Sequence, residues 1–259
     1  SGKLVSNTSA TLNWTEPKSA DYYNIYRKDG HNSYVLIGRT VGKECSYTDK
    51  TLKGGNTYYY RVKPVHKIRD LVYESDYSNT VTVKTLGKVK VTSIKLNSAK
   101  SATIKFNSVD GAAKYRIYRK KTTGKSYSLI AKTKKTSYTD KTLKLGKTYD
   151  YVVVAQGSSV AIQSEKSNVK SVAALNSPKA TFIAKKSIIT VKVTPLKYAE
   201  KYSVYYKKSG SKSYKLLKTS KKTSVTAKKL SSNTKYNFRI VALKGNYSGT
   251  QITYTVKTK

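Results

Sequence analysis

The sequence predicts an all-β chain of three tandem antiparallel β-sandwiches, and three observations lead to that fold class. A segment recurs: residues 46–62 and 137–153 are identical at 13 of 17 positions, and a weaker copy spans residues 224–240. Apolar residues alternate with polar ones at a period of two, whereas helical spacing is absent. The alternating runs are short and recur with turn residues between them roughly every 8–12 residues, which is typical of a sandwich.

Two strands of each repeat carry the alternation most clearly. The early strand has its apolar positions at Ala10, Leu12 and Trp14, at Ala102, Ile104 and Phe106, and at Ile189, Val191 and Val193. The later strand has them at Tyr58, Tyr60 and Val62, at Tyr149, Tyr151 and Val153, and at Tyr236, Phe238 and Ile240. A strand patterned in this way buries one side and exposes the other. We therefore expect both strands to face the core of their own sandwich.

The spacing of the repeats sets the domain organisation. Equivalent residues recur after about 87–92 positions, which suits a small complete domain rather than a solenoid unit. The predicted modules are residues 1–87, 88–175 and 176–259. The joining segments are short and contain no Gly/Ser tract that would act as a flexible tether. We expect three modules arranged in series.

Several motifs of each repeat point to one family. The strand that reaches Trp14 is followed by Glu16-Pro17, and Tyr23-x-Ile25 opens the next strand. A Leu stands six residues before a Tyr in the pairs Leu52/Tyr58, Leu143/Tyr149 and Leu230/Tyr236. These features resemble the second strand, third strand and tyrosine corner of a fibronectin type III module. The resemblance implies immunoglobulin-like sandwiches of seven antiparallel strands each, with a corner Tyr hydroxyl bonded to the backbone upstream. It is specific for fold and nearly silent on function.

One residue departs from the pattern of the repeats. Pro64 stands where the other copies have Ala155 and Ala242, inside a strand expected to be central. Proline lacks the N–H that a strand ladder uses. We therefore expect a bulge or an early strand end at Pro64.

The composition is strongly basic, and the charge is distributed unevenly. The 259 residues include 52 Lys and Arg against 13 Asp and Glu, for a net charge of +39. A hydrophobic content of 37% with such a charge warns of disorder, but 24 Tyr and the patterned apolar residues favour folded modules. The three predicted modules carry net charges of +5, +15 and +19. The charge is therefore a gradient along the chain, and Lys carries most of it.

A Lys-rich surface favours diffuse attraction to a polyanion over sequence readout. The candidate partners are an anionic cell-wall polymer such as teichoic acid, an anionic polysaccharide, host glycans or proteins, the outer membrane face, and nucleic acid bound only non-specifically. The alternative is that the basic side chains only solvate strand edges and block aggregation. The candidate polyanion-binding residues are Arg119, Lys120, Lys121, Lys134, Lys135, Lys185, Lys186, Lys207, Lys208, Lys221, Lys222, Lys228 and Lys229.

Tyrosines form a second candidate surface. If Tyr23 and Ile25 point inward, Tyr26 points outward, as do Tyr118 and Tyr205 in the other repeats, and Tyr59 lies on a neighbouring strand. Sugars stack on exposed aromatic rings, so this face is a candidate for glycan binding. The alternative is cross-strand packing between Tyr and Lys that stabilises an exposed sheet.

The sequence offers little for catalysis or metal binding. His31 and His66 have no acid at a recognisable spacing, and Cys45 has no adjacent base. The acidic loop of Asp70, Glu74 and Asp76 is spaced unlike a Ca²⁺ loop. The longest aliphatic run is far shorter than a membrane helix. We expect no enzyme activity, no catalytic or metal-binding residue, no cofactor and no membrane span, and we expect a monomer.

The Lys-rich style of the repeats resembles tandem fibronectin type III segments in secreted or wall-associated proteins of Firmicutes. That resemblance implies a secreted or cell-surface array on a bacterial cell wall, which binds anionic polymers or glycans and presents neighbouring domains. Two alternatives stay open: a carbohydrate-binding adhesin that uses the exposed Tyr faces, and an inert spacer.

Overall fold

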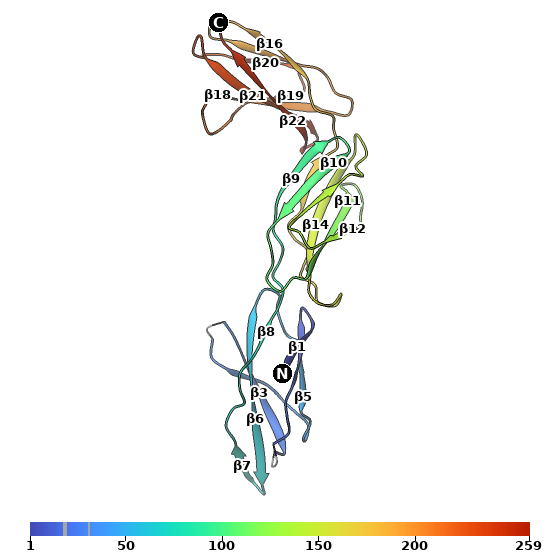
Figure 1. Cartoon of the computed structure of the whole chain (residues 1–259), viewed down its shortest axis with the longest axis vertical. Helices are drawn as coiled ribbons and strands as arrows, with labels where there is room; N and C mark the ends of the chain where they lie inside the picture. The colour runs from blue at the N-terminus through green and yellow to red at the C-terminus, as the bar shows by residue number, and fades with distance from the viewer. Residues whose placement is uncertain (18–19, 31) are drawn as a thin grey trace.

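A computed structural model describes residues 1–17, 20–30 and 32–259. It shows three all-β modules in series, with the first and third farthest apart (Figure 1). Every strand pairing is antiparallel, and each module consists of two sheets that pack face to face. The predicted fold class, tandem antiparallel β-sandwiches, is confirmed.

The first module contains a three-stranded sheet in the order β1-β2-β5 and a larger sheet in the order β4-β3-β6-β7, in which β8 also pairs with β6. The bounds are β1 Gly2–Ser6, β2 Ser9–Asn13, β3 Tyr22–Asp29, β4 Val35–Arg39, β5 Ser46–Asp49, β6 Thr57–Ile68, β7 Leu71–Glu74 and β8 Val81–Lys84. The described residues of this module thus form eight strands rather than the expected seven. The extra strand arises because β6 is long enough to pair first with β8 and then with β7.

The second and third modules have the expected seven strands each, and they share one layout. The second combines β13-β10-β9 with β12-β11-β14-β15, and the third combines β16-β17-β20 with β19-β18-β21-β22. The bounds in the second are β9 Val91–Ser98, β10 Ser101–Phe106, β11 Lys114–Lys121, β12 Ser128–Thr133, β13 Ser137–Asp140, β14 Thr148–Gln156 and β15 Lys170–Ala173. Those in the third are β16 Ala180–Ala184, β17 Ile189–Val193, β18 Lys201–Lys208, β19 Lys215–Ser220, β20 Ser224–Ala227, β21 Lys235–Lys244 and β22 Tyr247–Lys257.

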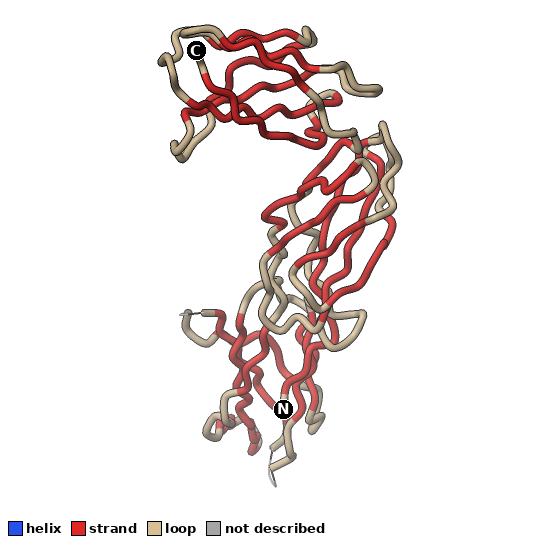
Figure 2. The backbone as a smooth tube through the Cα atoms, turned by 45° about the horizontal axis from the view of Figure 1, so that its top comes forward, coloured by secondary structure: helices blue, strands red, loops and turns tan. Residues whose placement is uncertain are grey.

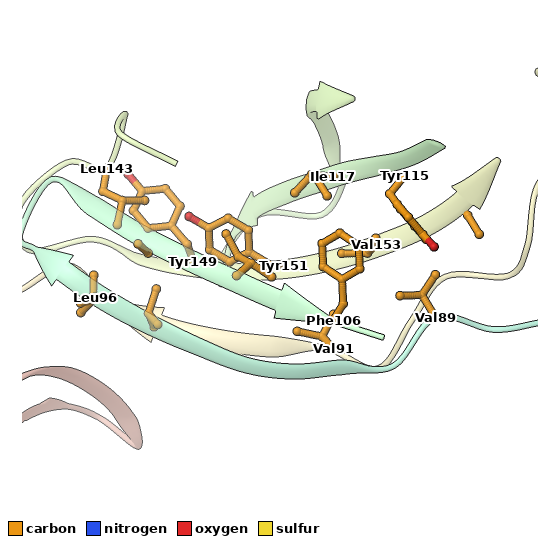
Figure 3. Close-up of a cluster of buried hydrophobic side chains, with 14 of the residues drawn as sticks. Val89, Val91, Leu96, Phe106, Tyr115, Ile117, Leu143, Tyr149, Tyr151 and Val153 are labelled. Atoms are coloured by element: carbon orange, nitrogen blue, oxygen red, sulfur yellow. The ribbon is translucent and has the colours of Figure 1, made fainter. Parts of the chain in front are cut away.

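The alternating apolar residues form the cores, as the sequence predicts. In the second module, Tyr149, Tyr151 and Val153 of β14 point into the core, where Phe106 of the opposite sheet lies beside Tyr151 and Val153 (Figure 3), and all four are buried. The Phe106 ring meets the Tyr115 ring edge-on, with centroids 4.9 Å apart. Trp14 takes the place of Phe106 in the first module and is only partly buried, 5.2 Å from the ring of Tyr23. Each sandwich therefore has a core of its own.

The tyrosine-corner hydrogen bonds occur in all three modules. The backbone N–H of Lys53 donates to the Tyr58 hydroxyl at 2.7 Å, that of Lys144 to Tyr149 at 3.1 Å, and that of Ser231 to Tyr236 at 3.0 Å. The ring of each Tyr is buried while its hydroxyl fixes the loop that precedes the strand.

The expectation of a bulge or an early strand end at Pro64 is wrong. β6 runs through Pro64 to Ile68, and its pairing with β3 keeps one register from Tyr22–Val65 to Asp29–Tyr58. The Pro64 carbonyl accepts the Ser75 N–H at 3.0 Å, so this residue's hydrogen-bonding side faces away from β3. The missing N–H therefore lies on the side where the partner strand changes from β8 to β7. The ladder with β3 needs no donor from Pro64.

Two short junctions connect the modules. Leu86 precedes the first predicted boundary but packs in the second core, and its backbone N–H donates to Asn7 Oδ1 at 2.6 Å. Leu175 precedes the second predicted boundary but packs in the third core. The chain bends at this second junction, so the third module is turned away from the line of the first two (Figure 2). The three modules therefore form a bent series.

Candidate binding surfaces

Arg119 belongs to a buried ion pair and not to an exposed basic patch. Its Nη1 lies 2.6 Å from Asp140 Oδ2, and the Tyr151 hydroxyl donates to the same carboxylate oxygen at 2.7 Å. Burial alone would raise the pKa of Asp140, but hydrogen bonds from Thr142 and Tyr151, together with the charge of Arg119, hold that pKa below its usual value. Burial, and then the contact with Asp140, raises the pKa of Tyr151. The prediction that Arg119 binds a polyanion is therefore corrected, because its guanidinium already has a buried partner.

The same position is filled differently in the other modules. The first module repeats the group, with Arg27 2.7 Å from Asp49 and the Tyr60 hydroxyl 2.8 Å from the same oxygen. In the third module the equivalent residues are Tyr206, Ala227 and Phe238. There the Tyr206 ring stacks on Phe238 with centroids 6.1 Å apart. An apolar stack thus replaces an ion pair at one position of the fold.

Six of the predicted Lys residues gather at the far end of the third module. The turn after β16 carries Lys185 and Lys186, and the loop after β20 carries Lys228 and Lys229. These segments touch, because the Leu230 N–H donates to the Ser187 carbonyl at 3.0 Å and the Lys259 N–H to that of Lys185 at 3.2 Å. Lys207 and Lys208 end β18 nearby, where the Ser209 N–H reaches the Lys235 carbonyl at 2.9 Å. We call this end, at the C-terminus in Figure 1, the distal pole.

The third module leaves its positive charge without ion-pair partners. Every ion pair among the described residues involves the first two modules, as in Arg27–Asp49, Lys63–Glu74 and Lys120–Asp150. The acidic residue of the third module, Glu200, accepts the Gly245 N–H at 2.8 Å instead. Twenty basic residues against this one carboxylate therefore produce a strong positive potential around residues 176–259.

The other predicted basic residues lie elsewhere. Lys134 and Lys135 are exposed in the turn between β12 and β13, and Lys221 and Lys222 are exposed in the turn between β19 and β20. Turns of antiparallel strands alternate between the two ends of a sheet, so Lys221 and Lys222 lie at the end of the third module opposite the distal pole. Lys134 and Lys135 lie at the equivalent end of the second module. Lys121 is exposed at the end of β11, while Lys120 donates to the Gly124 carbonyl at 3.1 Å. The thirteen residues therefore do not form one site.

The four predicted outward tyrosines are half-buried, and cations contact three of them. Arg116 Nε donates to the Tyr118 hydroxyl at 2.8 Å, Lys28 Nζ lies 5.3 Å from the Tyr59 ring, and Arg239 lies 4.6 Å from Tyr205. Tyr26 packs edge-on against Tyr77 with centroids 5.2 Å apart. Cations thus cover part of the face that a sugar would stack on, as the packing alternative expects.

A second set of tyrosines in contact with cations was not predicted from the sequence. Tyr34, Tyr127 and Tyr214 occupy one position in the three modules, and two cations contact each ring: Lys28 and Arg61, Lys120 and Lys166, and Lys207 and Arg239. The signal was present as a Ser-Tyr pair two residues before a Leu in each repeat, at Ser33, Ser126 and Ser213. Sequence reasoning missed it because the cations come from other strands.

The described His and Cys side chains of the first module each contact a different partner. His66 Nδ1 lies 2.7 Å from Asp21, and His31 lies outside the described residues. Cys45 Sγ lies 3.7 Å from the Tyr23 hydroxyl. Within the described part of the chain, no three His, Cys, Asp or Glu side chains are placed to hold a metal ion. The described residues also contain no helix long and apolar enough to cross a membrane.

Comparisons with known proteins bear on the fold. No curated protein matches the chain. Among solved structures, the chicken CNTN1 FN1–FN3 domains are 17% identical, with a TM-score of 0.39 over 100% of this chain and 97% of that one. A two-domain fibronectin type III segment of chicken tenascin is 22% identical, with a TM-score of 0.33 over 68% of this chain and 100% of that one. Residues 176–258 match the family model described as the fibronectin type III domain, so the third module is similar to that family, and the first two modules repeat its strand order.

Proposed function

We propose that the chain is a non-enzymatic binding and spacer array of a bacterial cell surface, which is held by its third module to an anionic wall polymer. Fibronectin type III domains commonly serve as binding or spacer modules and are typically extracellular, which supports this class of function. The observation that carries the proposal is the distal pole, where exposed Lys residues from three separate segments meet without a carboxylate partner.

The charge gradient sets the orientation of the array in this proposal. The third module, with net +19, lies against the anionic polymer, and the first module, with net +5, projects away from it. Lys is a mobile, hydrated point charge that suits a polymer with evenly spaced anions better than a defined phosphate geometry. The array acts as a secreted or surface-bound monomer and presents whatever lies beside its first module.

Sedimentation with purified Gram-positive cell walls tests the proposal. The full chain is compared with a variant in which Lys185, Lys186, Lys228 and Lys229 are changed to Gln. The matched control changes four exposed Lys of the first module, Lys3, Lys50, Lys53 and Lys67, to Gln and removes the same charge. Binding is measured between about 50 mM and about 0.5 M NaCl, a range over which screening of exposed charges rises steeply.

The distal-pole variant should bind at least about tenfold more weakly than the control variant at low salt, because each Lys near an anionic surface contributes on the order of 1 kcal/mol. Walls depleted of teichoic acid should lose the interaction with all three proteins. Equal losses in the two variants would show that position does not matter. Binding that is unchanged by salt would contradict electrostatic attachment.

A further inference from the structure

Arg239 is a fixed cation without a partner among the described residues. Its guanidinium carbon lies 4.6 Å from the centre of the Tyr205 ring and 4.5 Å from that of Tyr214, so two rings hold it in place. Its Nε is buried and donates to none of the described residues. An Arg held in one orientation before a ligand arrives loses little conformational freedom on binding.

The equivalent residue of the first module shows that the missing partner is specific to Arg239. Arg61 lies 4.6 Å from the Tyr34 ring, which matches the contact of Arg239 with Tyr214. Its Nε donates to Thr80 Oγ1 at 2.9 Å. Among the described residues, the guanidinium of Arg61 therefore has a hydrogen-bond partner and that of Arg239 has none.

Arg239 lines a groove where the second and third modules meet. The groove has a volume of about 370 Å³ and is lined by Lys95 and Ser171 of the second module and by Tyr205, Arg239, Ser248 and Gln251 of the third. Its lining residues, all of them described, include no carboxylate. The Ser171 hydroxyl donates to Asp150 at 2.6 Å. The Asp150 carboxylate, which is not among the lining residues, lies 3.7 Å from Lys120 Nζ. The groove therefore presents two cations and several neutral polar groups.

The segment that joins the second and third modules is anchored in the third module beside the groove. Thr250 Oγ1 donates to the Leu175 carbonyl at 3.1 Å, and Leu175 is fully buried in the third core. A Cβ at Gly249 would lie 2.8 Å from Leu175 Cδ1 and 3.0 Å from the Ala242 carbonyl, so this close approach requires glycine. The groove is therefore formed before a ligand enters it.

We propose that this groove binds one anionic saccharide unit, a hydroxylated sugar or polyol that bears a phosphate or a carboxylate. Arg239 and Lys95 hold the anionic group, because a guanidinium matches the geometry of both anions. Ser171, Ser248 and Gln251 hydrogen-bond the hydroxyl groups beside the Tyr205 ring. A groove of this size accommodates one such unit. The inference rests on the proposed function, since such a unit is the repeat of an anionic wall polymer, and it adds a defined site to the diffuse attraction.

Titration of the full chain with small probes, followed by the NMR amide signals of β9, β21 and β22, tests this assignment. The probes are glucose 6-phosphate, glucuronate, glucose and inorganic phosphate. Glucose 6-phosphate or glucuronate should bind more tightly than both glucose and phosphate, and the better of the two identifies the anion. Binding of phosphate as tight as that of the acidic sugars would overturn the proposal, as would a failure of both acidic sugars to bind.

Variants separate the groove from general charge. Arg239→Gln should weaken binding of the acidic sugar at least about tenfold, the loss expected from one hydrogen-bonded charge. Arg61→Gln removes an equally sandwiched charge and should leave binding unchanged. Lys95→Gln, at an exposed side chain that cannot disturb a core, should weaken binding while Lys192→Gln, exposed outside the groove, should not.

Equal effects in the groove and control variants would overturn the site. Failure of the proposed function has a different signature: the chain would bind the acidic sugar but would not sediment with walls. Conversely, if the groove binds no acidic sugar but the proposed function holds, the chain would still sediment with walls, and sedimentation would still depend on the Lys residues of the distal pole.

Discussion

Arg119 and Asp140 lie 2.6 Å apart, although they belong to different sheets of the second module. Only 1% of the Asp140 side chain is exposed, so its charge depends on the surrounding donors. Arg27 and Asp49 repeat the pair in the first module. The third module has Tyr206 and Ala227 instead. The fold therefore accepts either a buried ion pair or an apolar stack between its two sheets.

Removing the carboxylate should destabilise the first module. Asp49→Asn leaves Arg27 without its charged partner and should lower the free energy of unfolding by about 3 kcal/mol, because one member of a buried pair is lost. Trp14 is the single tryptophan of the chain and lies in this module, so its fluorescence during urea unfolding reports the change. A loss below about 0.5 kcal/mol, typical of surface substitutions, would contradict a structural role for the pair.

Replacing the Arg27–Asp49–Tyr60 group by the equivalent residues of the third module should restore much of the lost free energy of unfolding. The triple variant Arg27→Tyr, Asp49→Ala, Tyr60→Phe removes the buried charges together and supplies the apolar set, and such replacements are often neutral or stabilising. We expect it to be more stable than Asp49→Asn by at least about 1 kcal/mol in the same Trp14 assay. A triple variant less stable than the single variant would show that the apolar stack depends on other parts of the third core.

Acid should unfold the first two modules before the third. Burial alone would raise the pKa of Asp49, but hydrogen bonds from Thr51, Arg27 and Tyr60 hold it below its usual value, as those around Asp140 do. Since the folded pKa is lower than the unfolded value of about 3.9, the stabilisation is complete above that pH and is lost as the pH falls through the folded pKa. NMR amide signals of each module should show this order in an acid titration below about pH 4. Earlier loss of the third module would contradict it.

Ser75 and Ser164 are equivalent, because their N–H groups donate to the carbonyls of Pro64 and Ala155, but their removal should affect stability differently. In the second module the buried Ala155 N–H donates to Ser164 Oγ at 3.0 Å, whereas Pro64, at the same position of the first, has no N–H. Ser164→Ala should therefore cost about 1–3 kcal/mol, the penalty for an unpaired buried donor. Ser75→Ala should cost less than about 0.5 kcal/mol. Hydrogen exchange of peptides from β14 and β6 measures both, and equal costs would refute this account of Pro64.

The corner hydroxyl should contribute measurably to the first module. Tyr58→Phe removes the acceptor of the Lys53 N–H at 2.7 Å and should cost about 1 kcal/mol. Tyr59→Phe is the matched control, because Tyr59 is the next residue and faces outward beneath Lys28. Its effect on the Trp14 unfolding transition should stay within about 0.5 kcal/mol. If the control costs as much as Tyr58→Phe, the corner bond has no special role.

Features that depend on neighbouring residues in the sequence were predictable. Features that depend on contacts between strands far apart in the sequence were not. The alternation at Tyr149, Tyr151 and Val153 identified the inward face of β14, because successive side chains of a strand point to opposite sides. Arg119 was predicted to be part of an exposed basic run. Its partner Asp140 is 21 positions away in the sequence and comes within hydrogen-bond distance only when the two sheets pack. The sequence predicted that Pro64 would break the strand. Only the positions of β7 and β8 show that the missing N–H lies on the side where β6 changes its partner strand.

The sequence by itself determined three basic β-sandwich modules, their inward faces and a charge that rises toward the C-terminus. Repeats, period-two patterning and charge counts are properties of the chain alone. Only the tertiary structure decided which charges are neutralised, which gather at the distal pole, and that Arg239 opens into a groove between two modules. The physical reason is that strand pairing and sheet packing bring together residues far apart in sequence, and the energy of a charge depends on those neighbours.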